Sequence, residues 1–275
     1  MSDLGAADLE AAARRLVESL GKPKRRVRPR LARMLHEAED QEVATPNGAV
    51  MAWRLGGGPA SLMVHGWEDD NALWSPLIDT CAEMLRASVA FDLPGHGWSP
   101  AEDCSIQAAG NAVLAVAEAF GPIDSVVAHS FGCPATIWAM AHGLNVPRAV
   151  MIASPTPRTE TRSQARDMTR WEQAQLHDGE DPEVIARARV LMAERPPMRS
   201  NDRDFAVDDV LPTLTAKALI IHSMDDEQCP VANSQRMAEL WPGSELVLLD
   251  GLGHRLIAQE PDVVARVFEF VDAMD

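Results

Sequence analysis

Short apolar runs alternate with longer stretches of helical spacing from residue 41 onward. The runs predict strands, and they lie at 61–64, 88–91, 125–128, 149–153, 218–221 and 246–249. The stretches between them predict helices near 74–87, 105–120, 131–143, 231–241 and 259–273. Continuous apolar strands that alternate with helices are typical of a mostly parallel sheet covered on both faces. The predicted fold class is therefore α/β.

Three segments depart from this alternation. Residues 1–40 contain one predicted helix, 7–20, followed by the basic run 22–30, and Pro46-Asn47-Gly48 predicts a hairpin turn after them. Residues 156–212 contain no predicted strand, many charges and several prolines, which favours a helical cap inserted after a strand. The pattern thus predicts an N-terminal helical and basic extension at 1–40 and a helical cap at 156–212. The core is predicted in two pieces, 41–155 and 213–275.

The composition excludes several kinds of catalysis. The chain has no Tyr and only three Lys, which are Lys22, Lys24 and Lys217. Without Tyr there is neither a Tyr nucleophile nor a Tyr–Lys proton relay, and no Lys follows a glycine-rich loop as in a P-loop. The positions of the lysines also disfavour a Schiff base. Ser, His, Asp, Glu, Cys or a metal ion must then carry any chemistry.

The charge is uneven along the chain. The formal net charge is −16 at pH 7, and the acidic excess lies in residues 41–275, whereas residues 1–40 carry a small basic excess. An acidic body repels phosphate backbones, so nucleic acid is not an expected partner. The basic run 22–30 fits either a patch for nucleic acid or lipid or a linker that docks on the acidic body. The charge of that body favours the linker.

The cysteines and the apolar runs bear on the compartment. The four cysteines are far apart and form no CxxC pair, which predicts neither a disulfide framework nor a zinc site and fits a reducing cytoplasm. No apolar run approaches the roughly 18 residues that span a bilayer. The opening MSDLGAADLE lacks the order of a signal peptide. We expect a cytoplasmic, soluble protein without a membrane span, and the oligomeric state stays open.

One serine stands between a predicted strand and a predicted helix, in Ala128-His129-Ser130-Phe131-Gly132. Small residues lie two positions before and two positions after Ser130. This spacing fits a sharp, strained turn that exposes the hydroxyl group, because bulk at either flanking position would clash with neighbouring backbone. The next helix directs its N-terminal N–H groups toward the site, so the Phe131 amide can donate to an oxyanion.

A base and an acid follow later predicted strands. His254 comes after the last strand in a Gly-Leu-Gly-His loop, and Asp226 comes after the strand before it. A serine nucleophile needs a base within hydrogen-bonding distance, and the base needs an orienting carboxylate. Because the carboxyl ends of parallel strands meet at one edge of the sheet, we expect Ser130, Asp226 and His254 to act as nucleophile, acid and base.

With these motifs in this order, residues 41–275 resemble the α/β-hydrolase fold superfamily. The resemblance implies that fold's eight-stranded, mostly parallel sheet with a helical cap. It also implies that Trp67, after the strand-end His-Gly pair, supplies one oxyanion amide and that Phe131 supplies the other. Residues 92–99 match the D-x-P-G-x-G-x-S turn of the superfamily.

The superfamily motifs leave two points open in this chain. In the acid loop, counting back from Pro230 selects Asp226, and Asp225 and Glu227 are the alternatives. At the serine turn, Ala128 stands where G-x-S-x-G has its first glycine. Because the turn needs a small residue at that position, alanine is expected to be tolerated.

The resemblance implies a capped serine hydrolase that cleaves a small apolar carboxylic ester or related acyl compound through an acyl-enzyme. Trp67, Phe131 and Trp171 are candidate walls of an acyl pocket. We expect no cofactor and no metal, because no His/Asp cluster has metal-ligand spacing. The alternatives are a carbon–carbon bond hydrolase, a perhydrolase or acyltransferase, an aminopeptidase of the same fold, and a ligand-binding or sensing protein with a retained triad.

Some polar residues have no assigned role in this hypothesis. Packing and loop hydrogen bonds are expected for His65, His96 and His129, and a core position for Cys133. His222 could be a second base, but its place at a strand end favours a structural role. The acidic run 68–70 could bind a cation, although contiguous acids in a loop are usually solvated. Four arginines recur every four residues and would form one stripe if the segment is helical; they are Arg158, Arg162, Arg166 and Arg170. A solvated or core-paired stripe is favoured over a grip on an anionic substrate.

Overall fold

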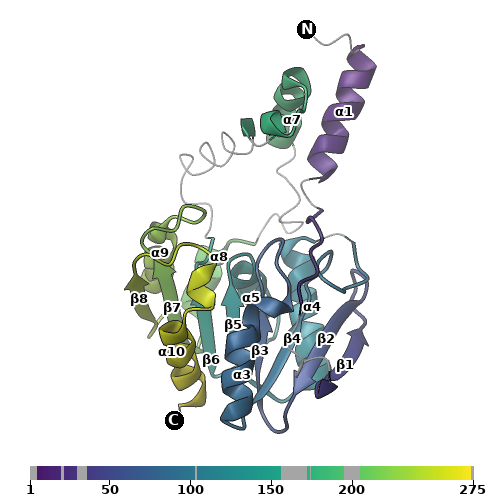
Figure 1. Cartoon of the computed structure of the whole chain (residues 1–275). Helices are drawn as coiled ribbons and strands as arrows, with labels where there is room; N and C mark the ends of the chain where they lie inside the picture. Colours follow the sequence, from purple (N-terminus) through teal and green to yellow (C-terminus); the bar gives the residue numbers. More distant parts are fainter. Residues whose placement is uncertain are drawn as a thin grey trace.

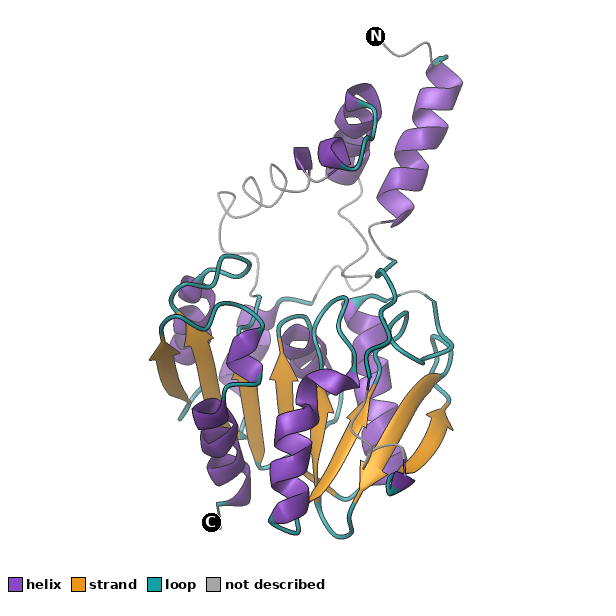
Figure 2. Ribbon diagram, viewed as in Figure 1, coloured by secondary structure: helices purple, strands orange, loops and turns teal. Residues whose placement is uncertain are grey.

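The computed structural model describes residues 5–19, 22–29, 36–102, 104–155, 172–173, 175–194 and 205–273. Within these residues, eight strands form one sheet in the order β1-β2-β4-β3-β5-β6-β7-β8 (Figures 1 and 2). The strands are β1 (Glu39–Val43), β2 (Val50–Leu55), β3 (Ala60–Val64), β4 (Ala87–Phe91), β5 (Ile123–His129), β6 (Arg148–Ile152), β7 (Lys217–Ser223) and β8 (Glu245–Leu249).

The strand directions confirm the predicted fold class. Strand β2 runs antiparallel to both β1 and β4, and the other five neighbouring pairs are parallel. Strands β1 and β2 form the predicted hairpin, with Val43 opposite Val50. Strands β3, β4 and β6 are buried along their whole length, as mostly apolar strands in a sheet covered on both faces should be.

Helices cover both faces of the sheet, and each face has its own apolar cluster. Helices α3 and α10 pack on one face, and α4, α5 and α9 pack on the other, as Figure 2 shows. The longer helices are α1 (Ala6–Ser19), α3 (Ser75–Glu83), α4 (Ile106–Phe120), α5 (Gly132–Ala141), α7 (Pro182–Glu194), α9 (Val231–Leu240) and α10 (Pro261–Asp272). Short helical turns are η1 (Asn71–Trp74), α8 (Val207–Val210), η2 (Leu211–Thr213) and η3 (Leu256–Ala258).

The N-terminal helix packs against a helix of the inserted segment. Helices α1 and α7 lie side by side beyond one end of the sheet (Figure 1). They share a small apolar cluster of Ala13, Leu16, Val184, Ile185, Ala188 and Leu191. At its edge, Arg187 Nε donates to a carboxylate oxygen of Glu10. The two segments that interrupt the sequence pattern therefore contact each other.

Parts of the predicted cap lie outside the described residues. These parts include Trp171 and the four arginines at 158, 162, 166 and 170. The described parts of 156–212 are helices and loops, without a strand. The division into extension, core and cap therefore stays a prediction.

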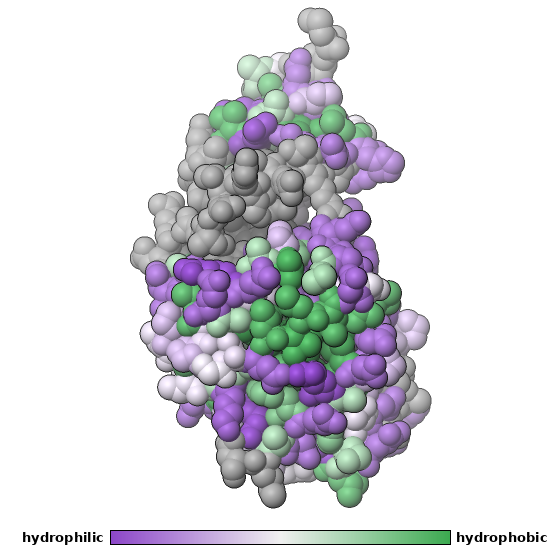
Figure 3. Space-filling model, turned by 90° about the vertical axis from the view of Figure 1, so that its left-hand side faces the viewer, coloured by the Kyte–Doolittle hydropathy of each residue, from purple (hydrophilic) through white to green (hydrophobic). Residues whose placement is uncertain are grey.

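The β8 side of the molecule carries apolar surface. Figure 3 views this side, and apolar residues gather there between polar margins. Exposed apolar side chains near β7 and β8 include Met224, Leu248 and Leu256. Among the described residues, no helix combines the length and the apolar character that a membrane crossing requires.

Candidate active site

The Ser130 turn joins β5 to α5. Ser130 has a φ of 50°, in the left-handed region that residues other than glycine rarely adopt. Its backbone N–H donates to the Ile152 carbonyl at 2.9 Å, and its own carbonyl accepts from the Cys133 N–H at 2.9 Å. These bonds to a neighbouring strand and to the next helix hold the serine in its strained conformation. The Ser130 side chain consequently stands at the end of the strand, as the spacing predicted.

Close backbone contacts explain the glycine two positions after Ser130. A Cβ atom on Gly132 would lie 2.5 Å from the carbonyl oxygen of Val64 and 2.7 Å from that of His65. On the other side of the turn, a Cβ atom on Gly66 would lie 2.9 Å from Ser130 Cβ. The loop after β3 therefore packs directly against the serine turn.

The variant Gly132→Ala is expected to be less stable than the wild type by about 1–3 kcal/mol, because overpacking against fixed backbone forces a local shift. Urea denaturation of both proteins measures this difference. The matched control is Gly57→Ala, since a Cβ atom there meets nothing within 4 Å. The control is expected to stay within about 0.5 kcal/mol of the wild type. Equal stability of Gly132→Ala and wild type would contradict the tight turn.

Ser130, His254 and Asp226 form one line of hydrogen bonds. Ser130 Oγ lies 2.9 Å from His254 Nε2, and His254 Nδ1 lies 2.7 Å from Asp226 Oδ2. The Asp226 side chain is fully buried and that of His254 is 9% exposed. With the Nδ1 proton directed at the carboxylate, Nε2 is left to accept the serine proton. The three residues expected from the sequence to work together thus lie within hydrogen-bonding distance.

Asp226 is held as a carboxylate. Its Oδ1 accepts from the backbone N–H groups of Gln228 and Cys229, each at 2.8 Å. Burial alone would raise the pKa of Asp226, but hydrogen bonds from His222, His254 and the Cys229 N–H outweigh burial and hold the pKa well below its usual range. An ionised acid at this position can orient His254 and stabilise its cation.

The two alternative acids lie elsewhere in the same loop. Asp225 Oδ1 accepts from the backbone N–H groups of Gly251 and Gly253, at 3.1 and 3.2 Å, and from the Ser223 hydroxyl. Asp225 therefore braces the loop that leads to His254, and its pKa is lowered, chiefly by the Ser223 hydrogen bond. Glu227 is exposed. The geometry thus brings Asp226 to the histidine.

His222 contacts the acid Asp226, a contact that the sequence did not predict. It lies in β7, fully buried, where Nε2 donates to the Cys229 carbonyl at 3.0 Å and is 3.4 Å from Asp226 Oδ2. Its Nδ1 pairs with Ser234 Oγ at 2.7 Å. His222 therefore has a structural role, as expected, and that role is to hold the loop of the acid Asp226. The four-residue spacing from His222 to Asp226 at a strand end was the available signal.

The loop after β3 is organised by two histidines. His65 Nε2 accepts from the Leu93 N–H, and His96 Nε2 accepts from the Glu68 N–H, each at 2.9 Å. Burial and the neighbouring His65 lower the pKa of His96 to about 3, so its ring is neutral near pH 7. Both rings thus serve loop structure, as expected from the sequence. Trp67 lies in this loop, between His65 and the Glu68 N–H that donates to His96.

Trp67 and Phe131 lie on facing segments of the site. Their rings meet edge to face with centroids 5.3 Å apart. Trp67 follows the Gly66 contact with the serine turn, and Phe131 directly precedes α5. This places both predicted oxyanion residues beside Ser130 in the fold.

The remaining candidates have structural surroundings. His129 Nε2 donates to the His254 carbonyl at 2.8 Å, and burial, with His254 beside it, lowers the pKa of His129 to about 4. Cys133 is buried, and burial raises the pKa of its thiol to about 12, so it is a poor nucleophile. The four cysteines form no disulfide bond. Among the described residues, no group of His, Cys, Asp and Glu has the arrangement of a metal site.

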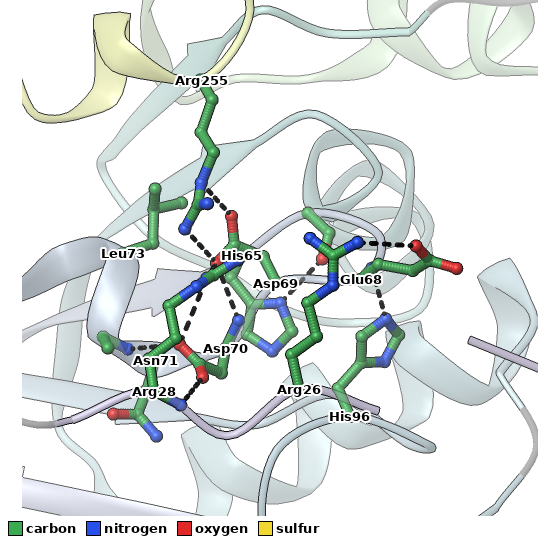
Figure 4. A network of polar contacts seen from close by, with 12 residues as sticks. Arg26, Arg28, His65, Glu68, Asp69, Asp70, Asn71, Leu73, His96 and Arg255 are labelled. Atoms are coloured by element: carbon green, nitrogen blue, oxygen red, sulfur yellow. Dashed lines mark hydrogen bonds and ion pairs between the residues drawn. The ribbon is translucent and has the colours of Figure 1, made fainter. Parts of the chain in front are cut away.

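The acidic run after Trp67 differs from its expected state. Asp69 and Asp70 are only 5% and 3% exposed, so a solvated loop is wrong for these two residues. Figure 4 shows Arg28 and Arg255 directed at Asp69 from different segments of the chain. Ion pairing with arginines distant in sequence explains how the carboxylates are buried.

The basic run docks on the core, as the favoured linker hypothesis predicted. Arg25 Nη1 donates to the carbonyls of Gly97 and Ser99, at 3.0 and 2.6 Å. Arg28 pairs with Asp69 and Asp70. The run therefore lies against the 92–99 turn and the acidic loop.

Comparison with known proteins agrees with the fold. The sequence profile of the alpha/beta hydrolase family matches residues 62–267. The chain is 25% identical over 245 residues to a pimeloyl-[acyl-carrier protein] methyl ester esterase of Nitrosomonas europaea, covering 78% of this chain and 96% of the relative. It is 27% identical over 252 residues to the protein of the same name from Xanthomonas campestris, covering 80% and 98%.

Solved esterases share the fold at low sequence identity. An esterase from Rhodococcus sp. superposes with a TM-score of 0.64 at 20% identity, covering 86% of this chain and 99% of the other. A Pyrococcus furiosus esterase gives a TM-score of 0.67 at 18% identity, covering 91% and 96%. Because the family profile spans most of the chain, this protein belongs to the alpha/beta hydrolase family of enzymes.

Proposed function

We propose that this enzyme hydrolyses carboxylic esters with Ser130 as nucleophile, His254 as general base and Asp226 as orienting acid. One observation carries the proposal. Ser130 Oγ, the two nitrogens of His254 and Asp226 Oδ2 form an unbroken line of hydrogen bonds of 2.9 and 2.7 Å. This is the arrangement that activates a serine hydroxyl for attack on an acyl carbon.

The reaction runs in two halves. In the first half, His254 Nε2 takes the Ser130 proton while Oγ bonds to the carbonyl carbon, and the carbonyl electron pair moves to oxygen. The carbon–oxygen bond to the alcohol then breaks, and His254 protonates the leaving alcohol. In the second half, water attacks the acyl-enzyme, His254 takes its proton, and the acid leaves as Ser130 regains a proton.

Backbone amides stabilise the charge that develops on the carbonyl oxygen. We assign this role to the N–H groups of Trp67 and Phe131. The Gly66 contact with Ser130 and the position of Phe131 before α5 support the assignment. Donors fixed by the fold need no reorganisation during the reaction, which makes such stabilisation a large part of catalysis.

The substrate class follows from the names of the relatives and from the aromatic pair. Relatives named methyl ester esterases support an ester bond as the target. The facing rings of Trp67 and Phe131 support an apolar acyl group beside the nucleophile. Trp171, the third predicted wall, lies outside the described residues. We propose that the inserted segment 156–212 caps this pocket and selects acyl length.

A substrate panel tests the proposal. The panel contains p-nitrophenyl esters of increasing acyl length, methyl esters, a lactone, an aminoacyl amide and a carbon–carbon diketone. We expect turnover of esters, with an optimum in acyl length, and no turnover of the amide or the diketone above background. Diketone turnover without ester turnover would replace the proposal by carbon–carbon bond hydrolysis. A saturable melting shift without product would replace it by a ligand-binding function.

A further inference from the structure

We infer that Arg28 is a positioning residue for the oxyanion loop, defined here as residues 65–70. Through its ion pair with Asp69, the N-terminal strap, residues 22–29, holds that loop in place for catalysis. The inference rests on the proposed function, because it concerns the loop to which we assign the Trp67 donor.

Asp69 is where three separate segments of the chain meet. Arg28 of the strap pairs with Asp69 Oδ1. Arg255 Nη2 donates to the same oxygen at 2.9 Å, and Arg255 Nε lies 2.9 Å from Oδ2. Because Arg255 directly follows His254, one buried carboxylate links the strap, the oxyanion loop and the loop of the general base (Figure 4).

The charges around Asp69 favour its ionised form. Burial alone would raise the pKa of Asp69, but the Asp70 N–H and the guanidinium groups of Arg255 and Arg28 outweigh burial and lower the pKa. The carboxylate therefore carries a full charge in a place where only 5% of the residue is exposed. A buried charge depends strongly on its partners, so the arginines determine where the carboxylate sits.

The strap follows the oxyanion loop over several residues. The Lys24 N–H donates to Glu68 Oε1 at 3.1 Å, and the Arg28 N–H donates to Asp70 Oδ2 at 2.7 Å. Glu68, between Trp67 and Asp69, has a φ of 54°. A non-glycine residue in that region keeps its conformation only where its surroundings impose it. The strap is one of those surroundings.

The strap is itself fixed before and after these contacts. Before it, α1 packs against α7. Within it, Arg25 donates to three carbonyls of the 97–101 segment. Arg28 is thus presented to Asp69 from an anchored backbone, with 24% of its side chain exposed. A group held in this way can transmit a position, whereas a freely rotating surface arginine could not.

Loss of Arg28 should weaken loop placement without removing the catalytic groups. Asp69 keeps Arg255, and Asp70 Oδ1 still accepts from the Ala72 N–H at 3.2 Å. We therefore expect Arg28→Gln to lower kcat by about tenfold and to change KM by less than about twofold, because a displaced oxyanion donor acts mainly in the transition state.

The control and the second readout separate positioning from general damage. Arg15→Gln removes the same charge from an exposed site on α1, and its kcat is expected to stay within about twofold of wild type. A trifluoromethyl ketone that adds to the serine mimics the transition state. Its affinity for Arg28→Gln should fall by the same factor as kcat. The affinity for the product acid should not change.

Two outcomes would overturn the inference. One is an unchanged kcat in folded Arg28→Gln. The other is a loss of kcat while the ketone binds as to wild type. If Arg28→Gln does not fold, Arg28→Lys decides, because it keeps the charge but not the planar fork. If the kcat of Arg28→Lys lies between that of wild type and one tenth of that value, and the ketone affinity falls by the same factor, the result supports positioning. A kcat equal to that of wild type opposes positioning. Fluorophosphonate labelling of wild type but not of Ser130→Ala tests the proposed nucleophile separately, so a failure of the Arg28 inference can be told from a failure of the proposed function.

Discussion

Replacing Ser130 by alanine is expected to lower ester hydrolysis by about 10⁵- to 10⁶-fold, one of the largest effects expected of a single change in this enzyme. The reason is that Ser130 Oγ is the only hydroxyl group in the described part of the chain that pairs with His254 Nε2. Without it no acyl-enzyme forms, and only binding and backbone amides are left to assist attack by water. Steady-state hydrolysis of a p-nitrophenyl ester measures the loss.

Covalent labelling gives the same prediction a second measurement. A fluorophosphonate should modify wild type at one equivalent per chain and leave Ser130→Ala unmodified, with the adduct located on Ser130 by mass spectrometry. The matched control is Ser244→Ala, because Ser244 lies in the turn before β8 and donates to the Ala238 carbonyl. Ser244→Ala should be labelled to the same stoichiometry as wild type and should hydrolyse the ester at the same rate. Labelling that persists in Ser130→Ala would exclude Ser130 as the nucleophile.

Replacing Asp226 by asparagine is expected to lower kcat by about 10⁴-fold with little change in KM. The asparagine can present an N–H to His254 Nδ1, which would place the histidine proton on Nε2 and prevent that nitrogen from accepting the Ser130 proton. It also removes the charge that stabilises the histidine cation. The Gln228 and Cys229 N–H bonds favour an oxygen at the Oδ1 position, which directs the amide nitrogen toward His254.

Glu227, the next residue along the chain, supplies the control for Asp226→Asn. Glu227→Gln neutralises an exposed carboxylate one residue away, and its kcat is expected to stay within about twofold of wild type. Melting temperatures of both variants show whether a loss reflects folding. If Glu227→Gln loses activity and Asp226→Asn keeps it, the acid is Glu227 and the hydrogen bond from Asp226 to His254 is structural.

The sheet was predictable because its strands are covered on both faces. A strand such as β3 is buried at every position and, apart from Ser61, apolar, so its run is visible without knowledge of its neighbours. Most helix ends lie within two residues of their predictions, because glycine, proline and capping residues act locally. Ser105, for example, accepts from the Ala108 N–H at the start of α4. The prediction of a helix over 74–87 was wrong at its end, since α3 ends at Glu83 and residue 87 begins β4. Strand order, by contrast, depends on which runs pair.

The buried polar groups were not predictable in the same way. His222 and Asp69 both looked like ordinary strand-end or loop residues. The partners of His222 lie within twelve residues of it but outside its own strand, whereas those of Asp69 lie far along the chain. Asp69 pairs with Arg28 and Arg255, which are separated from it by 41 and 186 positions. A contiguous acidic run is solvated unless distant cations reach it, and no local pattern states whether they do.

The sequence by itself determined the α/β fold class, the resemblance to the α/β-hydrolases and three candidate catalytic residues in chain order, because apolar periodicity and strand-end motifs are local signals. The tertiary structure alone decided which acid faces His254, that His222 supports that acid, and that the basic run lies against the oxyanion loop. Each of these facts is a contact between side chains on different elements or loops, and two of the three join residues that are distant in sequence. Such contacts depend on how the strands are ordered and how the loops are buried, and neither is written in any short segment of the chain.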